Sequence, residues 1–196
     1  MTLIKTIKNS LLWLAILVIS ILIGGGVAIY EIRTWKNSSQ VSIAHWQTIG
    51  KDKDVNSDEL LSIAQIAVYA TYPLTKKEVI YLNTSVDSEG NPIDVASDYV
   101  IEGKKFDARY WSITAYDQDG FLIQNKINNY SFNFENIAYN PDGNSFKIHL
   151  SAKDKESNWL PITNAKNVSL VIRLYQPSNW LRENLNEETL PIIKKV

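Results

Sequence analysis

Alternation of apolar and polar side chains with a period of two begins near residue 77, and it limits the fold more than any other feature. Turn-forming sequences separate the alternating runs, namely SEGNP at 88–92, DQDG at 117–120 and NPDG at 140–143. No helical pattern lies between these runs, so we predict a mainly β domain, an antiparallel β-sandwich or jelly-roll-like fold. The seven expected strands are EVIYLNTS, YVIEG, ARYWSITAY, FLIQN, YSFNFEN, SFKIHLSA and NVSLVIRLY.

A separate uncharged segment occupies residues 11–30, LLWLAILVISILIGGGVAIY. As a helix it would span roughly 30 Å, the thickness of the hydrocarbon layer of a membrane. A cleaved signal peptide is the alternative, because Lys5 and Lys8 precede the apolar run and cleavage after Ala28 would follow small residues. The run continues to Tyr30, which favours a retained, single-pass anchor. The flanking charges slightly favour an amino terminus on the cytoplasmic side.

One soluble amphipathic helix is predicted over residues 56–73, NSDELLSIAQIAVYATYP. Asp58 and Glu59 suit the first turn of a helix, and Pro73 is typical of its end. We therefore divide the chain into a membrane anchor with its flanks at 1–36, a polar tether at 37–44 and a β domain at 45–196.

The composition excludes some classes of function. Twenty basic and 21 acidic residues give a net charge of −1 without a long basic run, which argues against nucleic-acid binding. The chain has no cysteine, so disulfides and thiolate metal sites do not contribute. It has two histidines, His45 and His149, which we interpret as non-catalytic. We expect no metal and no cofactor.

An ordered series of sequence blocks resembles the DUF1214 family of bacterial proteins. The blocks are EVIYLNTSVDSEGNPIDVASDYVIEG, DARYWSITAYDQDGFLIQN, NYSF, DGNSFKIHLS, NWLP and VSLVIRLYQP, preceded by HWQT. The similarity covers roughly His45 to Pro191 and matches the short form with one amino-terminal membrane segment. It implies a β-sandwich or jelly-roll domain of unestablished function, often accompanied by a DUF1254 domain. For a bacterial protein of this kind, we expect the single-pass anchor in the inner membrane and the domain on the periplasmic side. Because only 55 residues precede the expected helix, we expect a companion DUF1254-type protein to bind as a separate chain.

Sequence motifs of catalysis are sparse. There is no Gly-x-Ser-x-Gly motif, and the acids at 87–91 and 117–120 fit tight turns better than calcium loops. Any carboxylate pair for glycoside hydrolysis, drawn from Glu102, Asp107, Asp117 and Asp119, is arbitrary at this stage. Trp159 and Trp180 lie in irregular segments, where we expect each to close an end of the core.

Three expected strands carry tyrosines on the face opposite their aliphatic side chains. If Trp111 points into the core, strand alternation places Tyr110 and Tyr116 on the reverse side. Arg173 interrupts an otherwise apolar strand on the corresponding face. The predicted ligand or partner face consists of Tyr81, Tyr110, Ser112, Thr114, Tyr116, Arg173 and Tyr175. The alternative is an ordinary outer face, because tyrosine, threonine and serine are all common in strands.

Two functions remain open. The favoured one is a membrane-anchored envelope module that binds a companion protein or ligand without catalysis. The other is an envelope enzyme for a lipid-like, glycan or small hydrophobic substrate, in which Arg173 and the tyrosines contact the reacting group.

Overall fold

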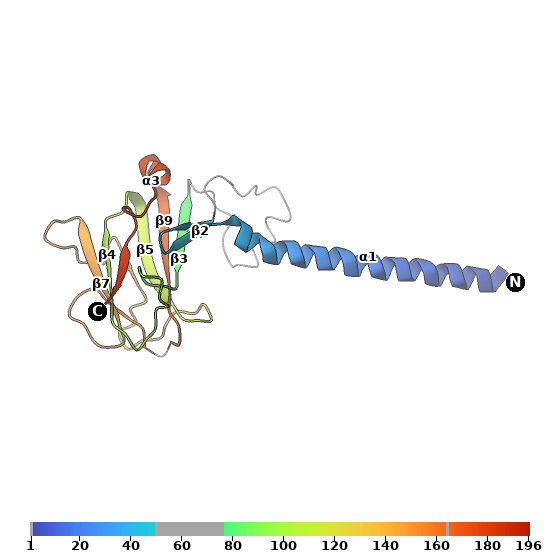
Figure 1. Cartoon of the computed structure of the whole chain (residues 1–196), viewed down its shortest axis with the longest axis horizontal. Helices are drawn as coiled ribbons and strands as arrows, with labels where there is room; N and C mark the ends of the chain where they lie inside the picture. The colour runs from blue at the N-terminus through green and yellow to red at the C-terminus, as the bar shows by residue number, and fades with distance from the viewer. Residues whose placement is uncertain (1, 50–76, 164) are drawn as a thin grey trace. The chain divides into compact units, whose positions relative to one another are not determined.

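The computed structural model describes residues 2–49, 77–163 and 165–196. A long helix and a β domain belong to two separate compact units (Figure 1). The helix expected over 56–73 lies outside the described residues. The predicted class, a mainly β sandwich preceded by an apolar helix, is confirmed.

Helix α1 comprises Thr2–Ser39 and runs through the three glycines at 24–26 without a break. Within it, Asn9–Glu31 is a 23-residue stretch that is long and apolar enough to cross a membrane. None of this stretch is buried against the rest of the protein, and Leu12 and Leu22 are mostly exposed. The length and composition of this stretch are those of a membrane-spanning helix. A signal sequence near the amino terminus can have the same length and composition.

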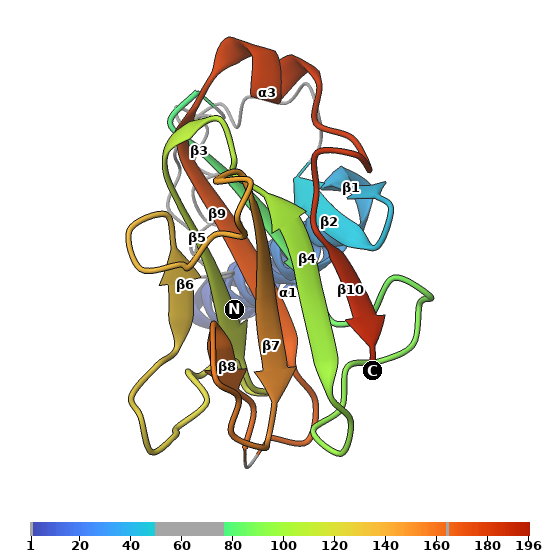
Figure 2. The same cartoon turned by 90° about the vertical axis from the view of Figure 1, so that its left-hand side faces the viewer.

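The β domain consists of two facing sheets (Figure 2). One has the strand order β1-β2-β3-β9-β5-β6, and the other β10-β4-β7-β8. All neighbouring strands are antiparallel except β7 and β8, which are parallel. The strands are β1 Gln40–Ile43, β2 Trp46–Ile49, β3 Val79–Thr84, β4 Tyr99–Lys104, β5 Ala108–Tyr116, β6 Ser131–Asn133, β7 Ser145–Ser151, β8 Trp159–Pro161, β9 Ser169–Pro177 and β10 Ile192–Lys195; the short helix α3 is Asn179–Glu183.

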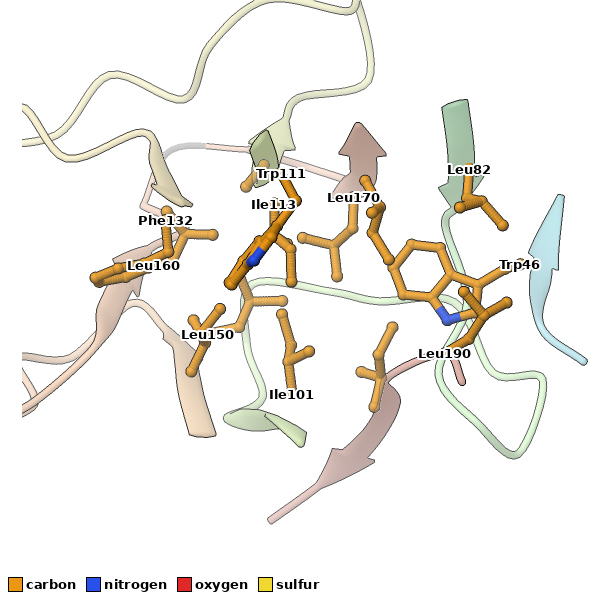
Figure 3. Packing of buried hydrophobic residues seen from close by; sticks show 14 of the residues in the cluster. Trp46, Leu82, Ile101, Trp111, Ile113, Phe132, Leu150, Leu160, Leu170 and Leu190 are labelled. Atoms are coloured by element: carbon orange, nitrogen blue, oxygen red, sulfur yellow. The ribbon is translucent and has the colours of Figure 1, made fainter. Parts of the chain in front are cut away.

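The core lies between the sheets and is built by the alternation seen in the sequence. On β9, Leu170, Ile172 and Leu174 are all fully buried, and each pairs with an inward-facing residue of β5. Figure 3 shows Trp111 and Ile113 of β5 packed between the layers. The indole of Trp111 stacks on the ring of Phe146 with centroids 5.3 Å apart, which joins the two sheets.

Three differences from the predicted strands stand out. FLIQN is not a strand, because Leu122 forms only an isolated bridge to Tyr116 and the Asp117 carboxylate closes a turn over Phe121. β6 is three residues long, shorter than the run YSFNFEN. β1, β2, β8 and β10 were not predicted, because strands of three or four residues carry too little alternation to be recognised.

The segment assigned to a tether holds structure. Helix α1 continues to Ser39, and β1 starts at Gln40 and pairs with β2. The buried Trp46 fixes β2 to the domain, since its Nε1 donates to the carbonyl of Pro191 at 2.8 Å. Residues 40–43 therefore belong to the six-stranded sheet.

Truncation of Ile172 to alanine should destabilise the domain by about 2–5 kcal/mol, because it leaves a cavity in a fully buried site. Val171→Ala, at the half-buried neighbouring position on the other face, is the matched control and should cost much less. Urea denaturation of the purified protein measures both. Equal costs for the two variants would show that the two faces of β9 are not packed differently.

Candidate functional site

The three strands that carry the predicted face are neighbours in the six-stranded sheet. β9 lies between β3 and β5, and Arg173 pairs in register with Tyr81 on one side and Ser112 on the other. Tyr175 likewise pairs with Tyr110. Directly paired residues point to the same face of a sheet, so these side chains share the face opposite the core.

The seven residues are not equally accessible on this face. Ser112 and Thr114 are only 7% and 6% exposed, so they form its floor rather than its surface. The others are half-buried and can contact both the floor and a bound group. They are Tyr81, Tyr110, Tyr116, Arg173 and Tyr175.

Arg173 is held in one orientation by neutral partners. Its Nη2 donates to the hydroxyl of Tyr116 at 2.7 Å, and its Nη1 donates to Oγ1 of Thr114 at 3.3 Å. Its guanidinium carbon lies 5.5 Å from the centroid of the Tyr116 ring and 6.0 Å from that of Tyr81. Cation–π attraction from both rings adds to these hydrogen bonds. We call Arg173, Tyr81, Thr114 and Tyr116 the arginine cluster.

The ionic state of the arginine cluster follows from its neighbours. The ion pairs in the described part of the chain use Lys147, Lys155 and Lys194, and none involves Arg173. Burial raises the pKa of the Tyr81 hydroxyl, as does Tyr175, while Arg173 opposes this effect. Tyr81 therefore stays neutral at physiological pH, and the cluster keeps the positive charge of Arg173.

A second group of rings lies farther along the same strands. Tyr110 packs edge-on against Tyr175 with centroids 5.7 Å apart, and Phe134 packs perpendicular to Tyr110 at 5.5 Å. These rings line an open groove of about 510 Å³. The polar lining residues are Glu78, Arg109, Glu135 and Gln176, and Arg109 donates to the Gln176 side chain at 3.0 Å. We call this the aromatic groove.

Sequence reasoning did not include Phe134 in the site. Alternation in YSFNFEN placed Phe134 on the same side as Phe132, which is in the core. However, β6 ends at Asn133, whose side chain accepts hydrogen bonds from the amides of Glu135 and Asn136 and turns the chain. An asparagine inside an expected strand was the available signal.

The family model for DUF1214, described as a protein of unknown function, matches residues 78–179, more than half of the 196 residues. The chain belongs to the DUF1214 family. The matched residues contain β3 to β9 and therefore the whole arginine cluster. A search of curated proteins found no match to this DUF1214 protein.

Two solved structures are similar to the DUF1214 protein. The VPA0106 protein from Vibrio parahaemolyticus has a TM-score of 0.61 and 24% identity over 88% of this chain. An uncharacterized protein from Burkholderia cenocepacia has a TM-score of 0.43 and 20% identity over 61% of this chain. The similar regions make up 42% and 29% of those proteins, so this chain spans less than half the length of either. The Vibrio structure shows the same fold.

The other candidate residues of the DUF1214 domain have structural roles. The carboxylate of Asp87 accepts the amides of Glu89 and Asn91, and that of Asp117 accepts the amides of Asp119 and Phe121, so the turn interpretation is confirmed. Glu102 binds Lys147 at 2.8 Å and Lys194 at 2.7 Å. Among the described residues, no three His, Cys, Asp or Glu side chains gather to hold a metal.

The histidines lie away from the predicted face. His45 is in the turn between β1 and β2, where burial lowers its pKa against the opposing effect of the Pro191 carbonyl. His149 is on β7 in the other sheet and pairs in register with Trp159. Neither histidine lies on a strand that contributes to the arginine cluster.

Acid sensitivity of the DUF1214 domain should depend on Asp98. Hydrogen bonds from Lys155 Nζ at 2.8 Å and from Ser151 Oγ at 2.7 Å lower the pKa of this carboxyl. A carboxyl whose pKa is lower in the folded state than in the unfolded state stabilises the fold at pH values above the unfolded-state pKa, near 3.9. This stabilisation is lost as the pH falls through the folded-state pKa. Asp98→Asn should therefore cost about 1 kcal/mol at pH 7 and little at pH 2.

Urea denaturation at a series of pH values measures this dependence. Glu156→Gln, at an exposed carboxylate nearby in the sequence, is the control and should leave the curve unchanged. An Asp98→Asn curve that runs parallel to the wild-type curve at every pH would contradict the assignment.

Proposed function

We propose that this chain is a membrane-anchored binding module of the bacterial envelope. In this proposal α1 remains in the inner membrane, and the β domain on the periplasmic side binds a companion protein. The binding surface is the outer face of the six-stranded sheet, formed by the arginine cluster and the aromatic groove.

The charge of Arg173 is the observation that carries the proposal. In the described part of the chain this guanidinium has hydrogen bonds to neutral oxygens and no ion pair. A half-buried cation without a carboxylate is only partly compensated by hydroxyl groups and rings. A carboxylate from a partner would complete its hydrogen bonds with a planar, two-pronged geometry that lysine does not provide.

The aromatic groove supplies the apolar part of the same surface. Tyr110 and Tyr175 line the groove, and their strand neighbours Ser112 and Arg173 belong to the arginine side of the face. Aromatic residues and arginine are enriched among the residues that dominate protein–protein binding. A partner that inserts an apolar side chain beside Phe134 while presenting a carboxylate to Arg173 would use both halves.

A DUF1254-type protein is the companion that the family membership suggests. In the Vibrio protein the region with this fold makes up 42% of the chain. This agrees with a domain that works beside further domains. An enzymatic role has less support. Acid–base or nucleophilic catalysis needs a group that accepts a proton, and the described residues of the arginine cluster offer an arginine and a tyrosine that burial keeps protonated, but no base.

The anchor is tested by the N-terminus of the mature protein. We expect Edman sequencing or intact mass of the protein purified from its membrane to find residues 11–30 retained, because the uncharged segment is long enough to span. Resistance to alkaline carbonate extraction should accompany this. A mature chain that begins at Ile29 would mean cleavage after Ala28 and would refute the anchor.

Arg173→Lys tests the binding face. The substitution keeps the charge but loses the forked donor set, so recovery of the companion DUF1254-type protein with the tagged full-length chain should fall about tenfold. Thermal stability should change little. Arg182→Lys on α3 is the matched control, because Arg182 hydrogen-bonds to Asn179 and belongs neither to the arginine cluster nor to the lining of the aromatic groove, so it should retain recovery. Unchanged recovery together with a lower melting temperature would make Arg173 a structural residue.

A further inference from the structure

A separate groove lies at the β6 edge of the six-stranded sheet, the edge opposite β1. Here the segment between β5 and β6 meets β8 of the other sheet. β6 and β8 are edge strands of the two sheets, and Figure 2 shows them toward the same edge of the domain. The Asn129 side chain joins the two, since its Nδ2 donates to the carbonyl of Trp159 at 2.8 Å. The groove has a volume of about 680 Å³, within the range of roughly 300–1,000 Å³ typical of small-molecule sites. We call it the Trp159 groove.

Trp159 forms an aromatic wall that is fixed in place. Its Nε1 donates to the carbonyl of Ser151 at 3.0 Å, so the polar atom of the indole is already satisfied. Trp46 and Trp111 are fully buried in the core, whereas Trp159 is half-buried and lines the groove together with Pro161. The ring therefore offers a ligand apolar area in one orientation and no hydrogen-bond donor.

Polar groups of several kinds surround this aromatic wall. Lys126 and Asp154 line the groove, are exposed and take part in none of the ion pairs of the described chain. Gln124 accepts a hydrogen bond from Tyr130 at 3.3 Å, which orients its amide, and Thr163 lies next to it. The groove thus combines an ammonium, a carboxylate, an amide and a hydroxyl around one indole.

This combination selects among ligand classes. A lipid chain would leave the charged and amide groups without partners, which is costly when they are covered. A simple ion would be attracted by one of Lys126 and Asp154 and repelled by the other. A pyranose ring satisfies both requirements, because its C–H face packs on the negative face of an indole and its hydroxyls both donate and accept hydrogen bonds.

We propose that the Trp159 groove binds a pyranose ring of a glycan. The ring stacks on Trp159, its hydroxyls donate to Asp154, and they accept from Lys126 and Gln124. This site shares no residue with the arginine cluster or the aromatic groove, so the proposal stands independently of the companion protein.

The experiment is calorimetric titration of the full-length chain in detergent with three hexasaccharides: β-1,4-linked N-acetylglucosamine, β-1,4-linked glucose and α-1,4-linked glucose. We expect at least one to bind the wild-type protein. Trp159→Ala should weaken that binding by about tenfold or more, because stacking on an aromatic ring contributes about 1–3 kcal/mol. Trp159→Phe should retain most of the affinity, and Asp154→Asn should weaken it by about threefold to tenfold.

Two controls separate a binding site from a general effect. Trp180→Ala changes an exposed tryptophan on α3, outside the groove, and should leave the affinity unchanged. Arg173→Lys should also leave it unchanged, which distinguishes this site from the proposed partner face. If Trp159→Ala does not fold, Asp154→Asn still decides, because it should weaken binding while Trp159→Phe retains it. Failure of all three sugars to bind, or binding that Trp159→Ala or Asp154→Asn leaves intact, would overturn the proposal.

Discussion

Contact between Trp111 and Phe146 joins the two sheets, and much of the domain is organised around it. Trp111 belongs to β5 and Phe146 to β7, and their rings are nearly parallel at an interplanar angle of 22°. Phe106 closes the group by packing edge-on against Trp111 at 5.3 Å. Gly103 of β4 makes room for the Phe146 ring, since a Cβ at position 103 would lie 2.6 Å from Cζ of Phe146. Any larger residue at 103 would force this stack to move.

Fixing Trp111 toward the core determines what the reverse face presents. Because strand residues alternate, an inward Trp111 places Tyr110 and Ser112 outward. The residues of β9 that pair with them, and those of β3 that pair with β9, therefore face outward too. A shift of one residue would bury Arg173 between the sheets, where an unpaired charge is very costly. Core packing and the charge of Arg173 therefore favour the same register.

The sequence predicted the core and the candidate face better than it predicted the strand list. Alternation was sufficient for β5 and β9, which are nine residues long, and it identified the face of Tyr110 and Arg173 correctly. It failed for FLIQN, where the side chain of Asp117 closes a turn, and for β8, which is three residues long. The position of Phe134 and the unequal exposure of Trp159 and Trp180 depend on where turns end. Alternation carries no information about where a turn ends. The expectation that Trp180 closes an end of the core was wrong, because the Trp180 side chain is 58% exposed.

Glu102 on the four-stranded sheet and Arg173 on the six-stranded sheet have different kinds of neighbours. Hydrogen bonds from Lys147 and Lys194 lower the pKa of Glu102, which therefore has opposite charges beside it. On the six-stranded sheet, Arg173 has hydroxyls and rings instead. Exposed ion pairs of the kind that Glu102 forms contribute little stability. Among the described residues no ion pair occupies the Arg173 guanidinium, so its forked donor set has the geometry that binds a carboxylate, and the physical basis of the proposed partner face lies there.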